Sequence, residues 1–264
     1  MKNLLIFTMI FLLSGCISTS DPQTDPGTGN NGNPPKIEET VQPTEPKDTS
    51  LFHEYKSDAL KTLNNMTLEE KVGQMFLVRC PDEEQRDLYL SMKPGGFILF
   101  GKDFADKTKQ QIIDDIRYYQ ANNSIPMIIG VDEEGGTVVR ASSNPLLIEE
   151  RFKSPQELYI TGGLEAIKQD AEEKSKFLLN LGINLNLAPV ADVSINETDF
   201  IHQRAFGKSA PETGEYVKTV VSAMKHSGIS STLKHFPGYG SNADTHTGSA
   251  YDTRPYEQFV NSDF

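Results

Sequence analysis

Short apolar runs alternate with segments of helical periodicity from residue 51 onward, and this alternation restricts the fold more than any other feature of the sequence. Apolar residues that recur every three or four positions indicate amphipathic helices, whereas short apolar runs bounded by glycine or proline indicate buried strands. Strands separated by helices pair in parallel, because each helix carries the chain back along the sheet. The pattern predicts an α/β fold with about five strands, at residues 75–78, 97–100, 127–131, 184–189 and 231–235.

Two architectures contain such repeated units, an open doubly wound sheet and a (β/α)8 barrel, and periodicity does not separate them. Several helix boundaries carry clear signals. Thr67 stands three residues before Glu70, and Ser154 three residues before Glu157, which is the spacing of a capping box. A later helix is expected to stop at Gly228, because glycine favours the left-handed conformation that ends many helices.

The N-terminus has the pattern of a secretory signal. Lys2 precedes an apolar run at residues 4–13, too short for a membrane-spanning helix, and "LSGC" follows and ends at Cys16. This stretch resembles a bacterial lipobox, so we expect residues 1–16 to form a lipoprotein signal with acylation of Cys16. An ordinary secretory signal with an incidental cysteine is the alternative. The lipid anchor would place the protein outside the cytoplasm on the bacterial cell membrane.

Residues 17–50 are rich in Pro, Gly, Asn, Thr and acidic side chains and contain almost nothing apolar. Such a segment cannot bury enough surface to offset its ordering entropy, so we expect a disordered tether ahead of a folded domain at residues 51–264. The net charge of −12 and the sequence pI of about 4.9 argue against nucleic-acid binding. Cys80 lacks a second cysteine in the mature domain and is expected to lie in the core.

Polar residues follow several expected strands at their carboxyl ends, where the sites of α/β proteins are built. These residues are Asp132, Asp192, Lys234 and His235. Side chains alternate along a strand, so Lys234 and His235 are expected to point to opposite sides unless the following Pro and Gly distort the strand end. No GxGxxG or Walker loop follows any expected strand, which weakens a nucleotide-binding interpretation.

Asp244 and His246 stand two residues apart in a Gly-rich loop after the last strand. A carboxylate that holds an imidazole in one tautomer makes it a general acid and base near neutral pH. Alternatively, Asp244 caps a turn and His246 is merely exposed. A third interpretation has His235, Asp244 and His246 binding a metal, which would require a further ligand.

The sequence "KHFPGYG" followed by "DTH" resembles the "KHFPGHG" and "DSH" signature of family 3 glycoside hydrolases, in their bacterial β-N-acetylglucosaminidase branch. Further motifs occur in the order of the family, namely "EEKVGQMF", "GGFILF", "GVDEEGG", "INLNLAPVADV" and "RAFG", over residues 68–254. The family's catalytic domain is a (β/α)8-like barrel. The resemblance therefore favours part of a TIM-like barrel over an open doubly wound sheet.

The resemblance also implies an activity, the retaining, exo-acting removal of terminal β-linked N-acetylglucosamine, with no metal or cofactor. The expected lipid anchor, which would place the domain beside peptidoglycan, suggests cell-wall fragments as the natural substrate. It implies that Asp132, Arg204, Lys234 and His235 bind the hydroxyls of the sugar in the −1 subsite. Asp244 and His246 would form the acid/base dyad. Another family 3 specificity, such as β-glucosidase or β-xylosidase, is an alternative that the "DTH" motif counts against.

Other residues near these motifs receive no catalytic role. One of Glu133 and Glu134 is expected to be solvated and the other held by backbone amides, and Asp192 is interpreted as structural. Tyr239 stands in place of the family's second histidine and Thr137 in place of its arginine after "EGG". Both departures affect fine substrate contacts.

The family's nucleophile is an aspartate in a stretch resembling "VIVTDALNM", and the sequence contains no such stretch. Asp263 is not a credible substitute. The expectation is therefore a barrel truncated after about the fifth strand, at residue 264, that lacks turnover by itself. A non-catalytic, carbohydrate-binding surface lipoprotein is a further alternative.

Overall fold

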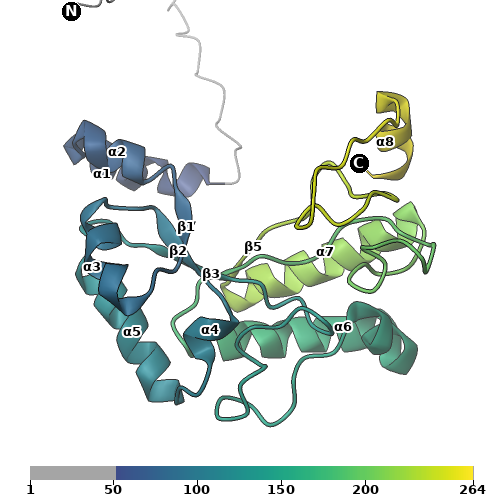
Figure 1. Cartoon of the computed structure of the whole chain (residues 1–264), viewed down its shortest axis with the longest axis horizontal. Coiled ribbons are helices and arrows are strands. Elements are labelled where there is room, and N and C mark those ends of the chain that lie inside the picture. The colour runs from purple at the N-terminus through teal and green to yellow at the C-terminus, as the bar shows by residue number, and fades with distance from the viewer. Residues whose placement is uncertain (1–51, 264) are drawn as a thin grey trace, which may run out of the picture. The chain divides into compact units, whose positions relative to one another are not determined.

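The computed structural model describes residues 52–263 of the chain (Figure 1). The predicted signal at residues 1–16, the acylation of Cys16 and the tether at residues 17–50 lie outside the described residues. Within residues 52–263, no helix combines the length and the apolar character that crossing a bilayer requires.

Five parallel strands form one sheet, in the spatial order in which they occur in the chain. The α/β class and the five strands are confirmed. Over the described residues the sheet is open, with β1 at one edge and β5 at the other, so it is not a closed barrel. The strands are β1 (Leu77–Arg79), β2 (Gly96–Leu99), β3 (Ile128–Val131), β4 (Leu185–Asn186) and β5 (Ser230–Ser231).

The last two strands are shorter than the sequence predicts. β4 was expected to extend to residue 189, but Pro189 has no N–H to donate to a neighbouring strand. Beyond Ser231 the chain no longer forms a regular ladder and makes a single isolated bridge, between Val190 and Lys234. The segment 231–235 is therefore mostly a strand-end loop, which frees its side chains from strict alternation.

The helices follow the predicted signals. Thr67 and Ser154 each cap a helix with a complete capping box, and Gly228 ends α7 in the left-handed conformation. In Figure 1, α3, α5, α6 and α7 succeed one another around the strands. The helices are η1 (His53–Tyr55), α1 (Lys56–Asn65), α2 (Leu68–Gly73), α3 (Glu83–Ser91), α4 (Gly101–Phe104), α5 (Lys109–Ala121), α6 (Pro155–Leu179), α7 (Ala210–Ser227) and α8 (Tyr256–Ser262).

The core lies between the sheet and these helices. Phe97 and Ile129 of the central strands are fully buried, and they pack with Ile116 of α5, Leu178 of α6 and Met224 of α7. All of these helices therefore bury their apolar faces against the sheet. This arrangement leaves the carboxyl ends of the strands available for polar residues.

Cys80 belongs to this core, as predicted, with its Sγ 3.6 Å from the hydroxyl of Tyr119. Burial raises the pKa of the Cys80 thiol to about 12.

Since the thiolate is the reactive form, a thiol reagent at pH 8 is expected to modify folded Cys80 at least about a hundredfold more slowly than the urea-unfolded chain. A Cys16→Ser background leaves Cys80 as the sole thiol for this measurement. Equal rates in the folded and unfolded chain would contradict the burial.

Candidate active site

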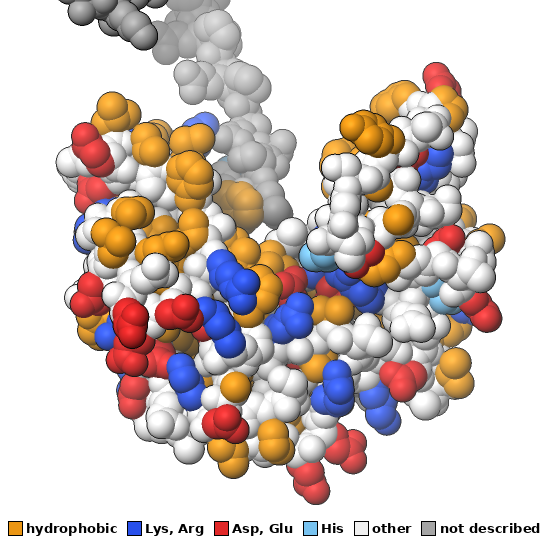
Figure 2. Space-filling model, viewed as in Figure 1, with side chains coloured by type: hydrophobic (Ala, Val, Ile, Leu, Met, Phe, Trp, Pro, Cys, Tyr) orange, Lys and Arg blue, Asp and Glu red, His pale blue; other side chains and the backbone are white. Residues whose placement is uncertain are grey.

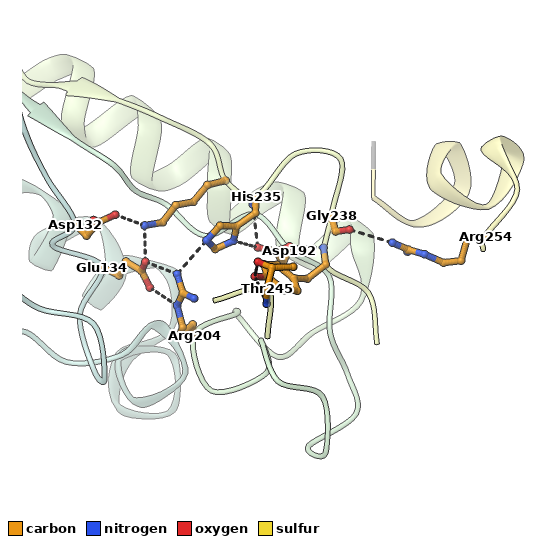
Figure 3. A network of polar contacts seen from close by, with 10 residues as sticks. Asp132, Glu134, Asp192, Arg204, His235, Gly238, Thr245 and Arg254 are labelled. Carbon is orange, nitrogen blue, oxygen red and sulfur yellow. Dashed lines mark hydrogen bonds and ion pairs between the residues drawn. The ribbon is translucent and has the colours of Figure 1, made fainter. Parts of the chain in front are cut away.

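Polar side chains meet at the carboxyl ends of the strands (Figure 3). Asp132 and Glu134 follow β3, and Lys234 and His235 follow β5, while Arg204 belongs to the long connection between β4 and α7. Hydrogen bonds and ion pairs join them into one cluster, called here the Glu134 network. Its members are Asp132, Glu134, Asp192, Arg204, Lys234 and His235.

Glu134 is the centre of this network. Arg204 grips its carboxylate through two N–H groups, Nε at 3.0 Å and Nη2 at 2.8 Å, and Lys234 Nζ lies 2.5 Å from Oε1. Lys234 also donates to Asp132 at 2.6 Å. The side chain of Glu134 is only 4% exposed and lies between two mostly buried cations, while Asp132 supplies the second negative charge. These charge-assisted hydrogen bonds fix the positions of the Glu134 carboxylate, the Arg204 guanidinium and the Lys234 ammonium group.

Burial alone would lower the pKa of Arg204, but the hydrogen bonds and the charge of Glu134 outweigh it and raise that pKa above its ordinary value. Arg204 is therefore permanently charged in the network. Its Nη2 also lies 3.0 Å from Nε2 of His235. Since a guanidinium can only donate, Nε2 of His235 is the acceptor in this contact.

Asp192 orients His235 from the other side. Its Oδ2 lies 2.7 Å from Nδ1 of His235 and accepts the His235 backbone N–H at 3.0 Å, while Oδ1 accepts the Tyr239 backbone N–H at 2.7 Å. A carboxylate only accepts, so Nδ1 carries the proton and the tautomer of His235 is fixed. The side chain of Asp192 is fully buried. The structural role predicted for Asp192 is thus the orientation of a site residue.

Lys234 and His235 both belong to the network, so the expectation that they point to opposite sides is wrong. Strict alternation requires a regular strand, and β5 ends three residues earlier at Ser231. The bridge from Lys234 to Val190 is isolated, so the backbone at Lys234 and His235 is not held in a regular strand. It can therefore present both of these consecutive side chains to one site.

Of the two neighbouring carboxylates, Glu133 agrees with the expectation of one held and one solvated group, and Glu134 does not. Glu133 is held as predicted, because Gly135 and Gly136, at φ of 102° and 63°, reverse the chain and bring later backbone amides onto its carboxylate. Glu134 is not solvated but buried. The groups that donate to Glu133 are the backbone N–H groups of Arg140, Ala141 and Ser142 and the hydroxyl of Ser142.

Asp244 and His246 form the predicted pair on the loop after β5. Oδ1 of Asp244 lies 2.6 Å from Nδ1 of His246 and accepts the His246 backbone N–H at 2.9 Å. These two hydrogen bonds, the backbone one first, hold the pKa of Asp244 below its ordinary value. The imidazole is 76% exposed, so its Nε2 is open to a ligand or to water.

Tyr239 links this dyad to the Glu134 network. Its hydroxyl lies 2.5 Å from Oγ1 of Thr245, between the two dyad residues, and its backbone N–H bonds to Asp192. Both ring nitrogens of His235 are engaged within the network. The grouping of His235, Asp244 and His246 as metal ligands is therefore disfavoured, since His235 offers no free lone pair.

Arg254 closes the base of the loop that carries the dyad (Figure 3). It donates to the carbonyl of Gly238 at 3.1 Å, sixteen residues earlier in the chain, and to Asp263 at 2.9 Å. Arg254 also makes a bidentate contact with Asp252, and these hydrogen bonds lower the pKa of Asp252 to about 2. Asp263 is thus engaged in holding the loop, in line with its exclusion as a nucleophile.

The sequence argument missed Glu134 as a site residue. One signal was available, because Asp132 and Glu134 are two residues apart and an extended chain presents such residues on the same side. Nothing local indicates its partner Arg204, which lies seventy residues further along the chain.

The fold is that of a family of carbohydrate-active enzymes. The chain matches the N-terminal domain of glycosyl hydrolase family 3 over residues 67–264, and it belongs to this family. The membership predicted from the ordered motifs is confirmed.

Among its relatives is the beta-hexosaminidase LpqI of Mycobacterium tuberculosis, 29% identical over 198 residues that cover 74% of this chain and 49% of that protein. A beta-hexosaminidase of Photobacterium profundum is 31% identical over 173 residues, which cover 65% of this chain and 50% of the relative. The chain thus spans about half the length of these curated relatives.

Solved structures agree with this assignment. That of M. tuberculosis LpqI superposes with a TM-score of 0.67 at 26% identity, covering 76% of this chain and 58% of the other. A family 3 beta-N-acetylglucosaminidase from a Paenibacillus species gives a TM-score of 0.65 at 25% identity, covering 75% of this chain and 38% of the other.

Proposed function

We propose that this chain supplies the sugar-binding and proton-transfer half of a retaining β-N-acetylhexosaminidase that removes terminal N-acetylglucosamine. The observation that carries the proposal is the position of the Asp244–His246 dyad, linked through Tyr239 to a charged network at the strand ends. The names of the relatives support it, since two are beta-hexosaminidases and one structure is a beta-N-acetylglucosaminidase.

In this proposal the Glu134 network holds the sugar of the −1 subsite. Asp132 accepts hydrogen bonds from sugar hydroxyls, and Lys234, Arg204 and His235 complete the contacts. Glu134 and Asp192 act through these residues, because Glu134 fixes the two cations and Asp192 fixes the imidazole tautomer. The side chains are thus placed before the sugar arrives, which lowers the entropic cost of binding.

His246 transfers the protons of the reaction. Asp244, ionised because its pKa is lowered, accepts a hydrogen bond from Nδ1–H of His246 and stabilises the imidazolium, whose Nε2 gives its proton to the departing glycosidic oxygen. After departure the neutral Nε2 takes a proton from water, which attacks the anomeric carbon. The group that first attacks this carbon is an aspartate of the "TDA"-type motif, a stretch that the printed sequence does not contain.

The natural substrate and the location of the protein are further parts of the proposal. Acylation at Cys16, with the tether that follows, would place the domain outside the cytoplasmic membrane beside peptidoglycan fragments. Metabolic labelling with palmitate tests the anchor, and we expect the label to be lost on Cys16→Ala. Label that persists in the Cys16→Ala variant would contradict acylation at this residue.

The hydrolase proposal is tested with aryl N-acetyl-β-glucosaminide and two proteins, this chain and a longer one that adds the "TDA"-type strand end. We expect only the longer protein to cleave this substrate. If the printed chain by itself also cleaves it, the attacking group lies within the printed sequence. Cleavage of aryl β-glucosides or β-xylosides in preference would support the other family 3 specificities instead.

A further inference from the structure

Lys174 of α6 carries a buried charge that the proposed mechanism does not use. Its side chain is only 10% exposed, and it is the most deeply buried Lys or Arg among residues 52–263. Other Lys and Arg side chains are plentiful on the surface drawn in Figure 2, where water solvates their charges. A lysine stays buried where protein groups replace the lost solvation, so its partners indicate what it holds.

Three groups surround the ammonium group of Lys174. Its Nζ lies 2.9 Å from Oδ2 of Asp170, one helical turn earlier on α6, and donates to the backbone carbonyl of Glu134 at 3.1 Å. The centre of the Phe152 ring lies 5.2 Å from the same nitrogen. Because Asp170 neutralises the charge, Lys174 binds the Glu134 carbonyl without adding net charge beside the Glu134 network.

Glu134 is therefore held from two directions. Its carboxylate contacts Arg204 and Lys234 at the strand ends, and its carbonyl contacts Lys174 on the side of α6. Asp132 lies two residues earlier and shares Lys234 with Glu134. A shift of the Glu134 backbone would therefore move both carboxylates relative to the cations that they hold.

The turn that follows Glu134 packs closely against the same lysine. A Cβ atom added at Gly135 would lie 2.1 Å from the carbonyl oxygen of Lys153 and 3.5 Å from Nζ of Lys174, so no larger residue fits there. Gly136 donates its N–H to the carbonyl of Phe152 at 2.9 Å. The backbone at 134–136 is thus held by residues 152–153 and, through Lys174, by α6.

We propose that Lys174 is a positioning residue of the sugar site, because it holds the backbone that carries Asp132 and Glu134. This inference rests on the proposed function. Lys174 does not touch the sugar and acts through the Glu134 carbonyl. Asp170 acts one step further away, since it neutralises Lys174 and so allows the lysine to stay buried. The contact links α6 to the site at the strand ends.

The test uses variants that remove the contact without leaving a charge alone in the interior. Lys174→Met is combined with Asp170→Asn or, in a second version, with Asp170→Leu, because a lone buried Asp170 would destabilise the fold by itself. Lys168→Met, at an exposed lysine of the same helix, is the matched control. Ile116→Val removes a buried methyl group from α5 and serves as a control for lower stability. Circular dichroism verifies that each protein is folded.

Amide hydrogen exchange, followed by NMR, measures how firmly the turn is held. The N–H groups of Gly135 and Gly136 are hydrogen-bonded within and beside the turn. In the double variants we expect their exchange to accelerate about tenfold more than that of β2, the change that the loss of one charge-assisted hydrogen bond produces. Neither Lys168→Met nor Ile116→Val should accelerate the turn more than β2.

The sugar readout is an NMR titration of this chain with N-acetylglucosamine. We expect the dissociation constant to rise about tenfold in the double variants, since the carboxylates of the site are no longer held in place. It should stay unchanged in Lys168→Met and in Ile116→Val. The second control separates a displaced site from a less stable protein.

The outcomes distinguish the two proposals. Equal acceleration of the turn and of β2 in the double variants would show a general contribution to stability and overturn the positioning role. An unchanged affinity for N-acetylglucosamine despite a loosened turn would overturn it as well. If the unchanged chain does not bind N-acetylglucosamine, the proposed function fails, and the exchange rates still decide whether Lys174 holds the backbone at Glu134.

Discussion

Replacing Glu134 with glutamine is expected to lower the free energy of unfolding by about 3 kcal/mol or more, a large part of the stability of a typical domain. The variant keeps the volume of the side chain but removes the charge that balances Arg204 and Lys234. Lys234 retains its ion pair with Asp132, whereas Arg204 loses its ion pair and keeps neutral acceptors, the amide oxygen of the new glutamine and the imidazole of His235. A mostly buried guanidinium without an anion is the origin of the cost.

Urea unfolding followed by circular dichroism measures this effect, since the chain contains no tryptophan for fluorescence. Glu149→Gln is the matched control, because Glu149 is exposed, and its effect should stay within about 0.5 kcal/mol. A loss below about 1 kcal/mol for Glu134→Gln would show that the network does not depend on this charge.

Replacing His246 with alanine in the longer protein is expected to lower kcat/KM for a natural glycan by about 10²- to 10⁴-fold, the usual contribution of a positioned general acid. A sugar leaving group needs the proton as the glycosidic bond breaks. A nitrophenol leaving group departs without it, so kcat/KM for nitrophenyl N-acetyl-β-glucosaminide should fall much less.

His226→Ala is the control, because His226 is an exposed histidine of α7 away from the strand ends. It should leave both substrates unaffected. An equal loss on the two substrates in His246→Ala would indicate a binding role for His246, and no loss on either would remove it from the mechanism.

The fold was predictable because its signals are local. Apolar runs bounded by glycine, capping boxes at Thr67 and Ser154, and the stop at Gly228 each depend on residues close together in the sequence, and the structure confirms them. The lengths of β4 and β5 were wrong, since a strand also needs a partner whose backbone groups remain in register. Pro189 and the irregular chain after Ser231 interrupt that register.

The site was predictable only in part. The pair of Asp244 and His246 was found from its spacing, and the structure joins the two side chains. The role of Glu134 depends on Arg204 and Lys234, which lie far along the chain and reach it only through the parallel order of the strands. The catalytic and binding roles of these residues stay predictions until the proposed variants are measured.

The anchorage of Arg254 to Gly238 has a consequence for protein engineering. Since one guanidinium ties both ends of the segment 238–254 to the same point, changes at its tip need not alter the strands beneath it. We expect segments of different length, taken from other members of the family, to be transplantable between these two residues. The segment that carries Asp244 and His246 could then be exchanged while the sheet and its helices stay unchanged.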